Sequence, residues 1–179
     1  MRAAQLQLFT QAQNRSRREH GGSIRQGQRK LARPLATKRP LHLVLRSLRA
    51  TKSWSFLHRA NRARVHALVI DTAARYGIRL YRFENVGNHL HLVVQGRTRK
   101  GIRAFLRVLP QRLMFAVTGA RKGSPVGRFF DGILYSRVVS WGREFKILDS
   151  YLWKNALEAL GLDRTIVAEW RAAARSVPL

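Results

Sequence analysis

Strand-like and helix-like segments alternate along this chain in an order that few folds can accommodate. The segments 41–46 and 89–95 place apolar residues at every second position, which is the period of a strand with one buried face. A third strand is predicted at 78–85, and the tight turn 86–88 joins it to 89–95. A fourth strand is predicted at 129–139.

Helical patterns fill the intervals between these strands. One helix begins at Ser55 or just before it and ends near Tyr76, where Gly77 suits a helix C-cap. A second covers 101–117, and Pro110 inside it is expected to kink or split it. The remaining segments are a basic loop at 119–127, a last main helix at 143–160 closed by Gly161, and a short helix at about 163–175.

The resulting order is strand-helix-strand-strand-helix-strand-helix. It predicts an α+β domain with one antiparallel sheet and helices packed on one face, as in ferredoxin-like and RNA-recognition-like (RRM-like) domains. In that arrangement the first and third strands are neighbours. His42 and Arg46 then share the open face with His89 and His91, whereas the even-numbered residues of 89–95 point into the helices.

The charge of the chain narrows the class of partner. Lys and Arg number 35 against 9 Asp and Glu, which gives a formal net charge of +26. No acid occurs in 20–70 or in 85–130, which hold twelve and nine Lys/Arg. Because both runs extend through segments that are predicted to fold, nucleic acid is favoured over a merely solvated face. An anionic membrane surface is disfavoured, since no segment resembles a basic amphipathic anchor.

Composition also divides the chain into three parts. Residues 1–39 carry ten Lys/Arg and one acid without a clear period, so we expect a basic, partly disordered DNA-binding arm. The domain is expected at 40–161, followed by a C-terminal helix or tail at 162–179. The absence of cysteine rules out disulfides and thiolate zinc sites. There is no apolar run of transmembrane length and no signal-peptide core, so a cytoplasmic, nucleoid-associated protein is expected.

Two small groups of residues carry the candidate chemistry. His89 and His91 flank Leu90 in a predicted strand, so their side chains share a face, roughly 6–7 Å apart. Tyr151 and Asn155 lie one helical turn apart and also share a face. Two imidazoles and an amide oxygen are workable ligands for Mg²⁺, Mn²⁺ or Zn²⁺, and a phenol can attack a phosphate to form a covalent phosphotyrosine.

Each of these residues also has a structural interpretation. His-x-His alone is a weak signal, Tyr151 alone is more often a packed tyrosine, and Asn155 alone is most often solvated. Two other functions therefore stay open: a non-catalytic nucleic-acid-binding module on an RRM-like sheet, and a descendant of a DNA-cleaving enzyme that binds DNA without cleaving it. A phosphoesterase with two His-x-Thr/Ser motifs is disfavoured, because no second motif exists.

The two groups and their spacing together resemble a known family. Gly87 to Val94, which reads GNHLHLVV, is similar to the HUH motif of single-tyrosine transposases, and 128–139 resembles that family's fourth strand. Residues 151–155, which read YLWKN, resemble its Y-x-x-x-N/Q motif. The resemblance covers about residues 40–161 and is nearest to the REP-associated tyrosine transposases.

This resemblance implies a metal-dependent endonuclease and strand transferase that acts on hairpin-forming single-stranded DNA. Tyr151 would be the nucleophile that forms a 5′-phosphotyrosine, and His89, His91 and Asn155 would hold Mg²⁺ or Mn²⁺. Family members are monomers or homodimers, so either state is expected. The residues that we expect to contact DNA are His42, Arg46, Arg25, Arg29, Lys30, Arg33, Lys38, Arg39, Arg121, Lys122 and Arg128.

Overall fold

A computed structural model describes most of the predicted domain and parts of the predicted arm. The described residues are 18–22, 32–121, 123–159 and 161. The predicted C-terminal helix at 163–175 and the tail around it lie outside them.

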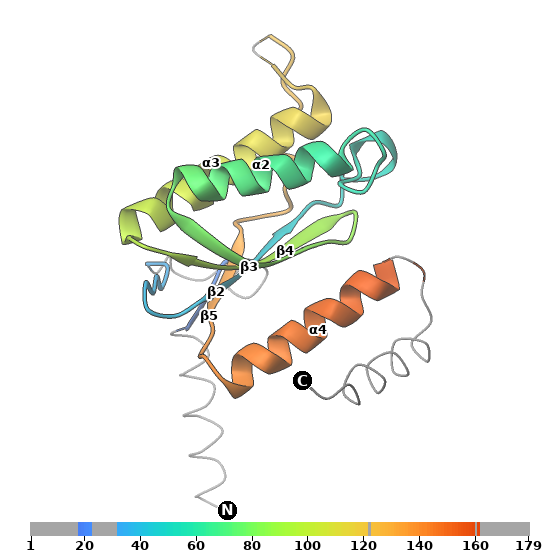
Figure 1. Ribbon diagram of the computed structural model, residues 1–179. Coiled ribbons are helices and arrows are strands. Elements are labelled where there is room, and N and C mark those ends of the chain that lie inside the picture. The colour runs from blue at the N-terminus through green and yellow to red at the C-terminus, as the bar shows by residue number, and fades with distance from the viewer. Residues whose placement is uncertain (1–17, 23–31, 122, 160, 162–179) are drawn as a thin grey trace, which may run out of the picture.

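The described chain forms one five-stranded antiparallel sheet in the spatial order β1-β5-β2-β4-β3 (Figure 1). Its strands are β1 (Glu19–His20), β2 (Leu41–Arg46), β3 (Ile78–Asn85), β4 (His89–Gly96) and β5 (Tyr135–Val138). As predicted, the first and third predicted strands, β2 and β4, are neighbours. β1 comes from the segment predicted as an arm and forms one edge of the sheet by pairing with β5.

Helices cover both faces of this sheet. α2 (Arg62–Arg75) and α3 (Arg99–Thr118) lie together on one face, and α4 (Arg143–Ala159) lies on the other (Figure 1). The main core lies on the α2 and α3 side and includes Leu43, Leu92 and Phe105, all with no exposed surface. The predicted α+β antiparallel sheet is therefore confirmed, with the difference that α4 packs on the opposite face.

Apolar residues on that second face explain the place of α4. Val93 in β4 and Val139 just after β5 form a smaller buried cluster with Leu148 and Leu152 of α4. Leu148 and Leu152 are four residues apart and so lie on one side of their helix. Burying a side chain of this size contributes about 1.5–3 kcal/mol, which is enough to hold an amphipathic helix against the sheet.

A short turn fixes the start of β4. Gly87 has a φ of 91°, a left-handed conformation that glycine adopts at no steric cost. The Asn85 side chain accepts from Gly87 N at 3.0 Å and donates to Phe56 O at 2.9 Å. The β3–β4 turn is thereby tied to the segment before α2, and His89 is held at the first position of its strand.

Three elements differ in the structure from what the sequence predicts: the start of α2, the continuity of α3 and the length of β5. The first helix begins at Arg62, because Asn61 donates to Ser53 O and Ser55 O and holds the preceding residues, which include the 3-10 helix η1 (Lys52–Trp54), in a turn. α3 runs unbroken through Pro110.

The physical reason for the continuity of α3 is its packing. Five of its residues at helical spacing are buried, and together they outweigh the backbone hydrogen bond that the proline cannot donate. They are Ile102, Phe105, Leu109, Leu113 and Val117.

The fourth predicted strand is shorter than expected, because residues 129–134 make other contacts. The Phe129 carbonyl accepts from Ser47 Oγ at 2.6 Å, and Asp131 N donates to Arg46 O at 3.0 Å. Phe129 is buried against Phe56 at a ring-centroid distance of 6.0 Å. Regular strand pairing therefore begins only at Tyr135.

Candidate active site

The two histidines of β4 face α4. Their rings lie 4.8 Å apart, between centroids, at 75°. Leu90 and Leu92 point the other way and have no exposed surface. The prediction that His89 and His91 share one face, with their neighbours turned into the helical core, is therefore confirmed, although α4 partly covers that face.

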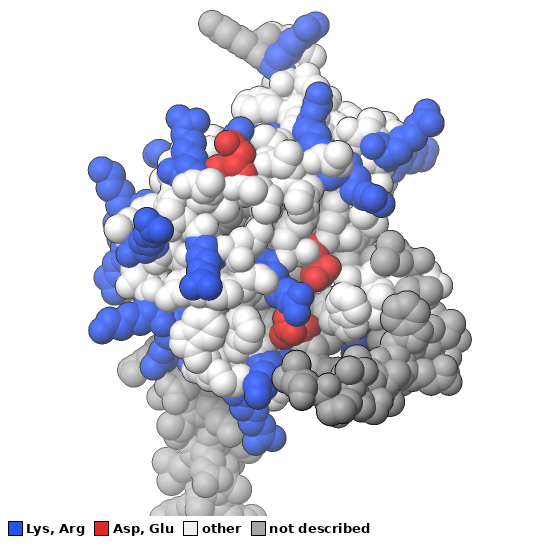
Figure 2. Space-filling model, viewed as in Figure 1, with Lys and Arg blue, Asp and Glu red and all other residues white. Residues whose placement is uncertain are grey.

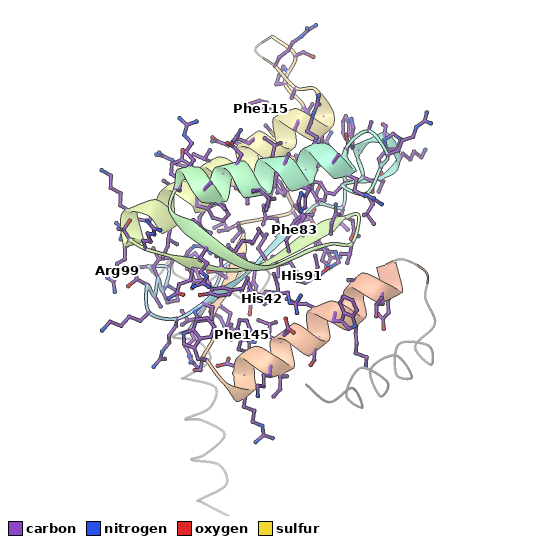
Figure 3. All side chains as sticks on the ribbon, viewed as in Figure 1. His42, Phe83, His91, Arg99, Phe115 and Phe145 are labelled. Carbon is purple, nitrogen blue, oxygen red and sulfur yellow. The ribbon has the colours of Figure 1, made fainter. Side chains whose placement is uncertain are left out.

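His42 joins this pair from β2. Its Nε2 lies 3.1 Å from Nδ1 of His91, and the two rings stack at 5.4 Å and 11°. Figure 3 shows both side chains between the sheet and α4. His42 is 6% exposed and His91 is 5% exposed. The structure thus places His42 against His91 and leaves little of its surface exposed, and the DNA contact expected for it stays a prediction.

The third participant, Tyr151, comes from α4. Its ring centroid lies 6.4 Å from that of His91, and the two planes are perpendicular at 89°. Leu148 and Leu152 bury the helix face on either side of this position, and the Arg82 side chain of β3 forms a two-contact ion pair with Asp149. Tyr151 itself is 53% exposed, so it reaches both the histidines and solvent.

Asn155 follows Tyr151 by one turn of α4 and is half-buried. Within the described part of the chain, no hydrogen bond or ring contact joins it to His89 or His91. The structure therefore brings Tyr151 to His91 but does not tie the predicted third ligand to either histidine by a hydrogen bond.

Burial keeps all three imidazoles neutral at neutral pH. Desolvation, followed by the neighbouring charge of His91, lowers the pKa of His42 to about 3. Desolvation and then His89 lower the pKa of His91 to about 4. The pKa of His89 is also lowered, by burial and then by Arg46. Neutral imidazoles carry the free lone pair that a metal ion requires.

The hydrogen-bond state of the ring nitrogens fits a metal site. His91 Nε2 is buried and has no hydrogen-bond partner among the described residues. His89 uses its Nδ1 in a 2.6 Å hydrogen bond with the Asn88 side chain, which leaves Nε2 available. Considering only His, Cys, Asp and Glu of the described residues, no group of three is placed to hold a metal, so a third ligand would have to be of another type.

Two further residues beside the site were not predicted from the sequence. Glu84 of β3 pairs in register with His91, and desolvation raises its carboxyl pKa. Tyr135 packs edge-on against His42 at 6.2 Å, and its pKa is raised to about 12, first by burial and then by Glu19. Only the cross-strand register identifies these neighbours, and a single strand's period does not encode that register.

The predicted DNA contacts divide by position. Lys38, Arg39 and Arg121 are exposed, as is Arg128, which donates to two backbone carbonyls of its own loop. Arg46 lies 3.5 Å from Asp131. Arg33 is half-buried and donates to Ser136 Oγ at 2.5 Å, so its role is at least partly structural. Outside the described residues lie Arg25, Arg29, Lys30 and Lys122.

Lys and Arg side chains are spread over the visible surface of the molecule, with few acids among them (Figure 2). The nine acids of the whole chain can neutralise only a minority of its 35 cations. Within the described ranges, no helix has the length and apolar character needed to cross a membrane.

Comparison with known proteins identifies the fold. No protein-family model matches the sequence, and no curated protein matches it. Among solved structures, a REP-associated tyrosine transposase bound to a REP hairpin superposes with a TM-score of 0.57 over 73% of each chain, at 8% identity. A Deinococcus radiodurans R1 protein, provisionally assigned as a transposase, gives a TM-score of 0.43 at 13% identity over 72% of this chain and 98% of that one. The first likeness shows that this chain has the fold of a single-tyrosine HUH transposase.

Proposed function

We propose that this protein is a metal-dependent single-stranded DNA endonuclease and strand transferase, either a transposase or a domesticated descendant of one. The observation that carries this proposal is the placement of Tyr151 beside His91. A partly exposed phenol stands at 6.4 Å from a neutral imidazole whose second nitrogen has no partner among the described residues. In a chain of net charge +26, this arrangement suits a phosphodiester substrate.

The proposed reaction begins at the Tyr151 phenol. Its Oη attacks the scissile phosphorus, the bond from phosphorus to the 3′ oxygen breaks, and the departing 3′ oxygen takes up a proton. Solvent can accept the phenolic proton, because Tyr151 is 53% exposed. The product is a 5′-phosphotyrosine, which retains the energy of the phosphodiester, so a second 3′-OH can displace the tyrosine and rejoin DNA without ATP.

A divalent ion would be held by His89 and His91, with the amide oxygen of Asn155 as the third ligand. The partnerless Nε2 of His91 and the free Nε2 of His89 fit this role. When bound, Mg²⁺ or Mn²⁺ supplies charge stabilisation to the scissile phosphate. Asn155 suits this role by its place, because it is half-buried and lies one turn after Tyr151 on the same side of α4.

A hairpin-forming strand is the proposed substrate. The solved transposase of the same fold is bound to a REP hairpin. The exposed basic residues Lys38, Arg39, Arg121 and Arg128 would contact the backbone, and Arg25, Arg29, Lys30 and Lys122 would add to them.

Incubation with a radiolabelled hairpin-bearing single strand and Mg²⁺ or Mn²⁺ tests the proposal. The wild type should give a protein–DNA adduct that survives a denaturing gel. Tyr151→Phe should give neither adduct nor nick while binding the same DNA nearly unchanged, because only the hydroxyl is lost. Nicking by Tyr151→Phe at the wild-type rate would refute the assignment. DNA binding without any adduct, across hairpins of varied sequence, would instead favour the non-catalytic binding module.

A further inference from the structure

His42 is an unusual residue for the centre of a sheet. β2 lies between β5 and β4, and its side chains at 41, 43 and 45 are apolar and buried. His42 is nearly as buried, at 6% exposure. A buried imidazole normally has a hydrogen-bond partner, and the one recorded for this side chain is the ring of His91.

The contact between the two rings restricts where their protons lie. The atoms that face each other are Nε2 of His42 and Nδ1 of His91, 3.1 Å apart. Two neutral imidazoles place a single proton between those atoms. If His42 held it, the proton of His91 would lie on its Nε2, which is buried and has no acceptor among the described residues. If Nδ1 of His91 holds the proton, Nε2 of His91 carries a lone pair instead.

The neighbours of His42 favour its role as the acceptor. Burial opposes protonation of the ring, followed by His91 and then by Arg137 of β5, which pairs in register with His42. Tyr135 packs edge-on against the same ring and limits its rotation. His42 is therefore a neutral ring held in a fixed orientation, with its Nε2 directed at His91.

We propose that His42 is a positioning residue: it accepts a hydrogen bond from His91 Nδ1–H, which fixes the ring orientation of His91 and presents the His91 Nε2 lone pair to a divalent metal. The inference rests on the proposed function, because it assigns a role to the metal site. Groups that hold a metal-bound histidine in this way typically change metal affinity 10- to 100-fold when they are removed.

Long-range ¹H–¹⁵N spectra of the imidazoles in the metal-free, DNA-free protein test the first part of this proposal. We expect wild-type His91 to be protonated on Nδ1 and unprotonated on Nε2. In His42→Leu the tautomer of His91 should shift towards Nε2–H, and in His42→Gln, whose amide oxygen can accept the same hydrogen bond, it should stay on Nδ1. A wild-type His91 protonated on Nε2 would overturn the proposal without any variant.

Titration of the protein with Mn²⁺ by calorimetry tests the second part. His42→Leu should bind about 10- to 100-fold more weakly than wild type, and His42→Gln should recover most of the loss. His66→Leu is the matched control, since His66 lies on α2 and packs against Phe83 on the opposite face of the sheet. Circular dichroism checks that each variant is folded. If His42→Leu does not fold, the Mn²⁺ affinity of His42→Gln and the His91 tautomer in the wild type still test the proposal.

The outcomes separate this inference from the proposed function. Equal Mn²⁺ affinity in wild type and folded His42→Leu, with adduct formation intact in both, would overturn the positioning role alone. A wild type that binds Mn²⁺ but forms no adduct would overturn the proposed function alone. A wild type that binds no Mn²⁺ would overturn both the metal site and the role of His42.

Discussion

The imidazole of His91 has a neighbour on each of three sides. His42 contacts its Nδ1, the ring of His89 lies 4.8 Å away, and the ring of Tyr151 stands perpendicular to it at 6.4 Å. One buried side chain thus links two adjacent strands and a helix. At the scale of single residues, His91 is therefore the position through which the proposed metal site and the proposed nucleophile would be coupled to the fold.

Removing either histidine should abolish metal-dependent cleavage. We expect His89→Ala and His91→Ala to reduce Mn²⁺ affinity at least about tenfold, and Asn155→Ala to have a smaller effect, because imidazole is a stronger ligand for first-row metals than a neutral amide oxygen. Calorimetric titration and adduct formation measure both effects. Normal metal-dependent adduct formation by a His89→Ala/His91→Ala double variant would place the site elsewhere.

His42 and His91, the two most buried histidines of the site, should make the fold sensitive to acid. Their pKa values are about 3 and about 4 in the folded protein, against about 6.5 in the unfolded chain. Between those limits the unfolded state binds more protons than the folded state, so stability is full above about pH 6.5 and falls as the pH falls towards 4. Thermal unfolding at pH 7, 6 and 5 should show a smaller loss for His42→Gln, which removes one titrating ring. Identical pH dependence in both proteins would contradict this.

At the scale of elements, the position of α4 decides whether Tyr151 meets the histidines. Two leucines bury one side of the helix, and the pair formed by Arg82 and Asp149 fixes it to β3. Both charged side chains are partly exposed, at 44% and 31%, so the pair is worth only about 0.2–1 kcal/mol. Its structural effect is to set where along the sheet the helix lies.

Breaking this pair should therefore affect catalysis more than stability. Asp149→Asn should lower the free energy of unfolding by less than about 1 kcal/mol and slow adduct formation several-fold. The matched control is Asp71→Asn, which breaks the pair with Arg112 that joins α2 and α3 on the opposite face. It should have a similar effect on stability and leave the cleavage rate unchanged. Equal rate losses in the two variants would contradict the inference that the position of α4 along the sheet controls cleavage. Urea unfolding and single-turnover kinetics provide the two measurements.

At the scale of the whole molecule, one chain contains both halves of the candidate site. Tyr151 contacts the His91 of its own chain, so we expect the proposed reaction to need no second chain. Mixing Tyr151→Phe with His89→Ala/His91→Ala protein should therefore leave the mixture inactive in the adduct assay. Restored activity would show that the tyrosine acts on the histidines of a second chain.

The charge of the molecule should appear in the salt dependence of DNA binding. We expect replacement of Arg25, Arg29 and Lys30 by Gln to weaken binding and to reduce the slope of log affinity against log salt by about 0.7–0.9 per lost phosphate contact. These substitutions leave β1 intact, which deletion of 1–39 would not. Three exposed arginines of α3, on the face away from the histidines, make the matched control when replaced by Gln: Arg99, Arg103 and Arg107. Equal slopes in wild type and the arm variant would mean that the arm does not touch DNA.

Local sequence determined the strands, the turn and the directions of the side chains. The alternation in 41–46 and 89–95 assigns each residue to a face, because a strand has a period of two whatever lies beside it. That rule placed His89 and His91 together, and Gly87 marked the turn before them. Periodicity also located α3 and α4, whereas α3 is not split at Pro110, because the local propensity of proline was outweighed by the packing of a buried helix face.

Only the tertiary structure decided what those residues contact. The face chosen by α4 depends on Val93 in β4 and on Val139 just after β5, which meet only when β2 brings β4 and β5 to its two sides. The hydrogen bond between His42 and His91 depends likewise on the register between β2 and β4, which no single strand encodes. The sequence by itself thus determined which side chains could take part in the candidate site, and long-range pairing and packing decided that His42 and Tyr151 contact His91.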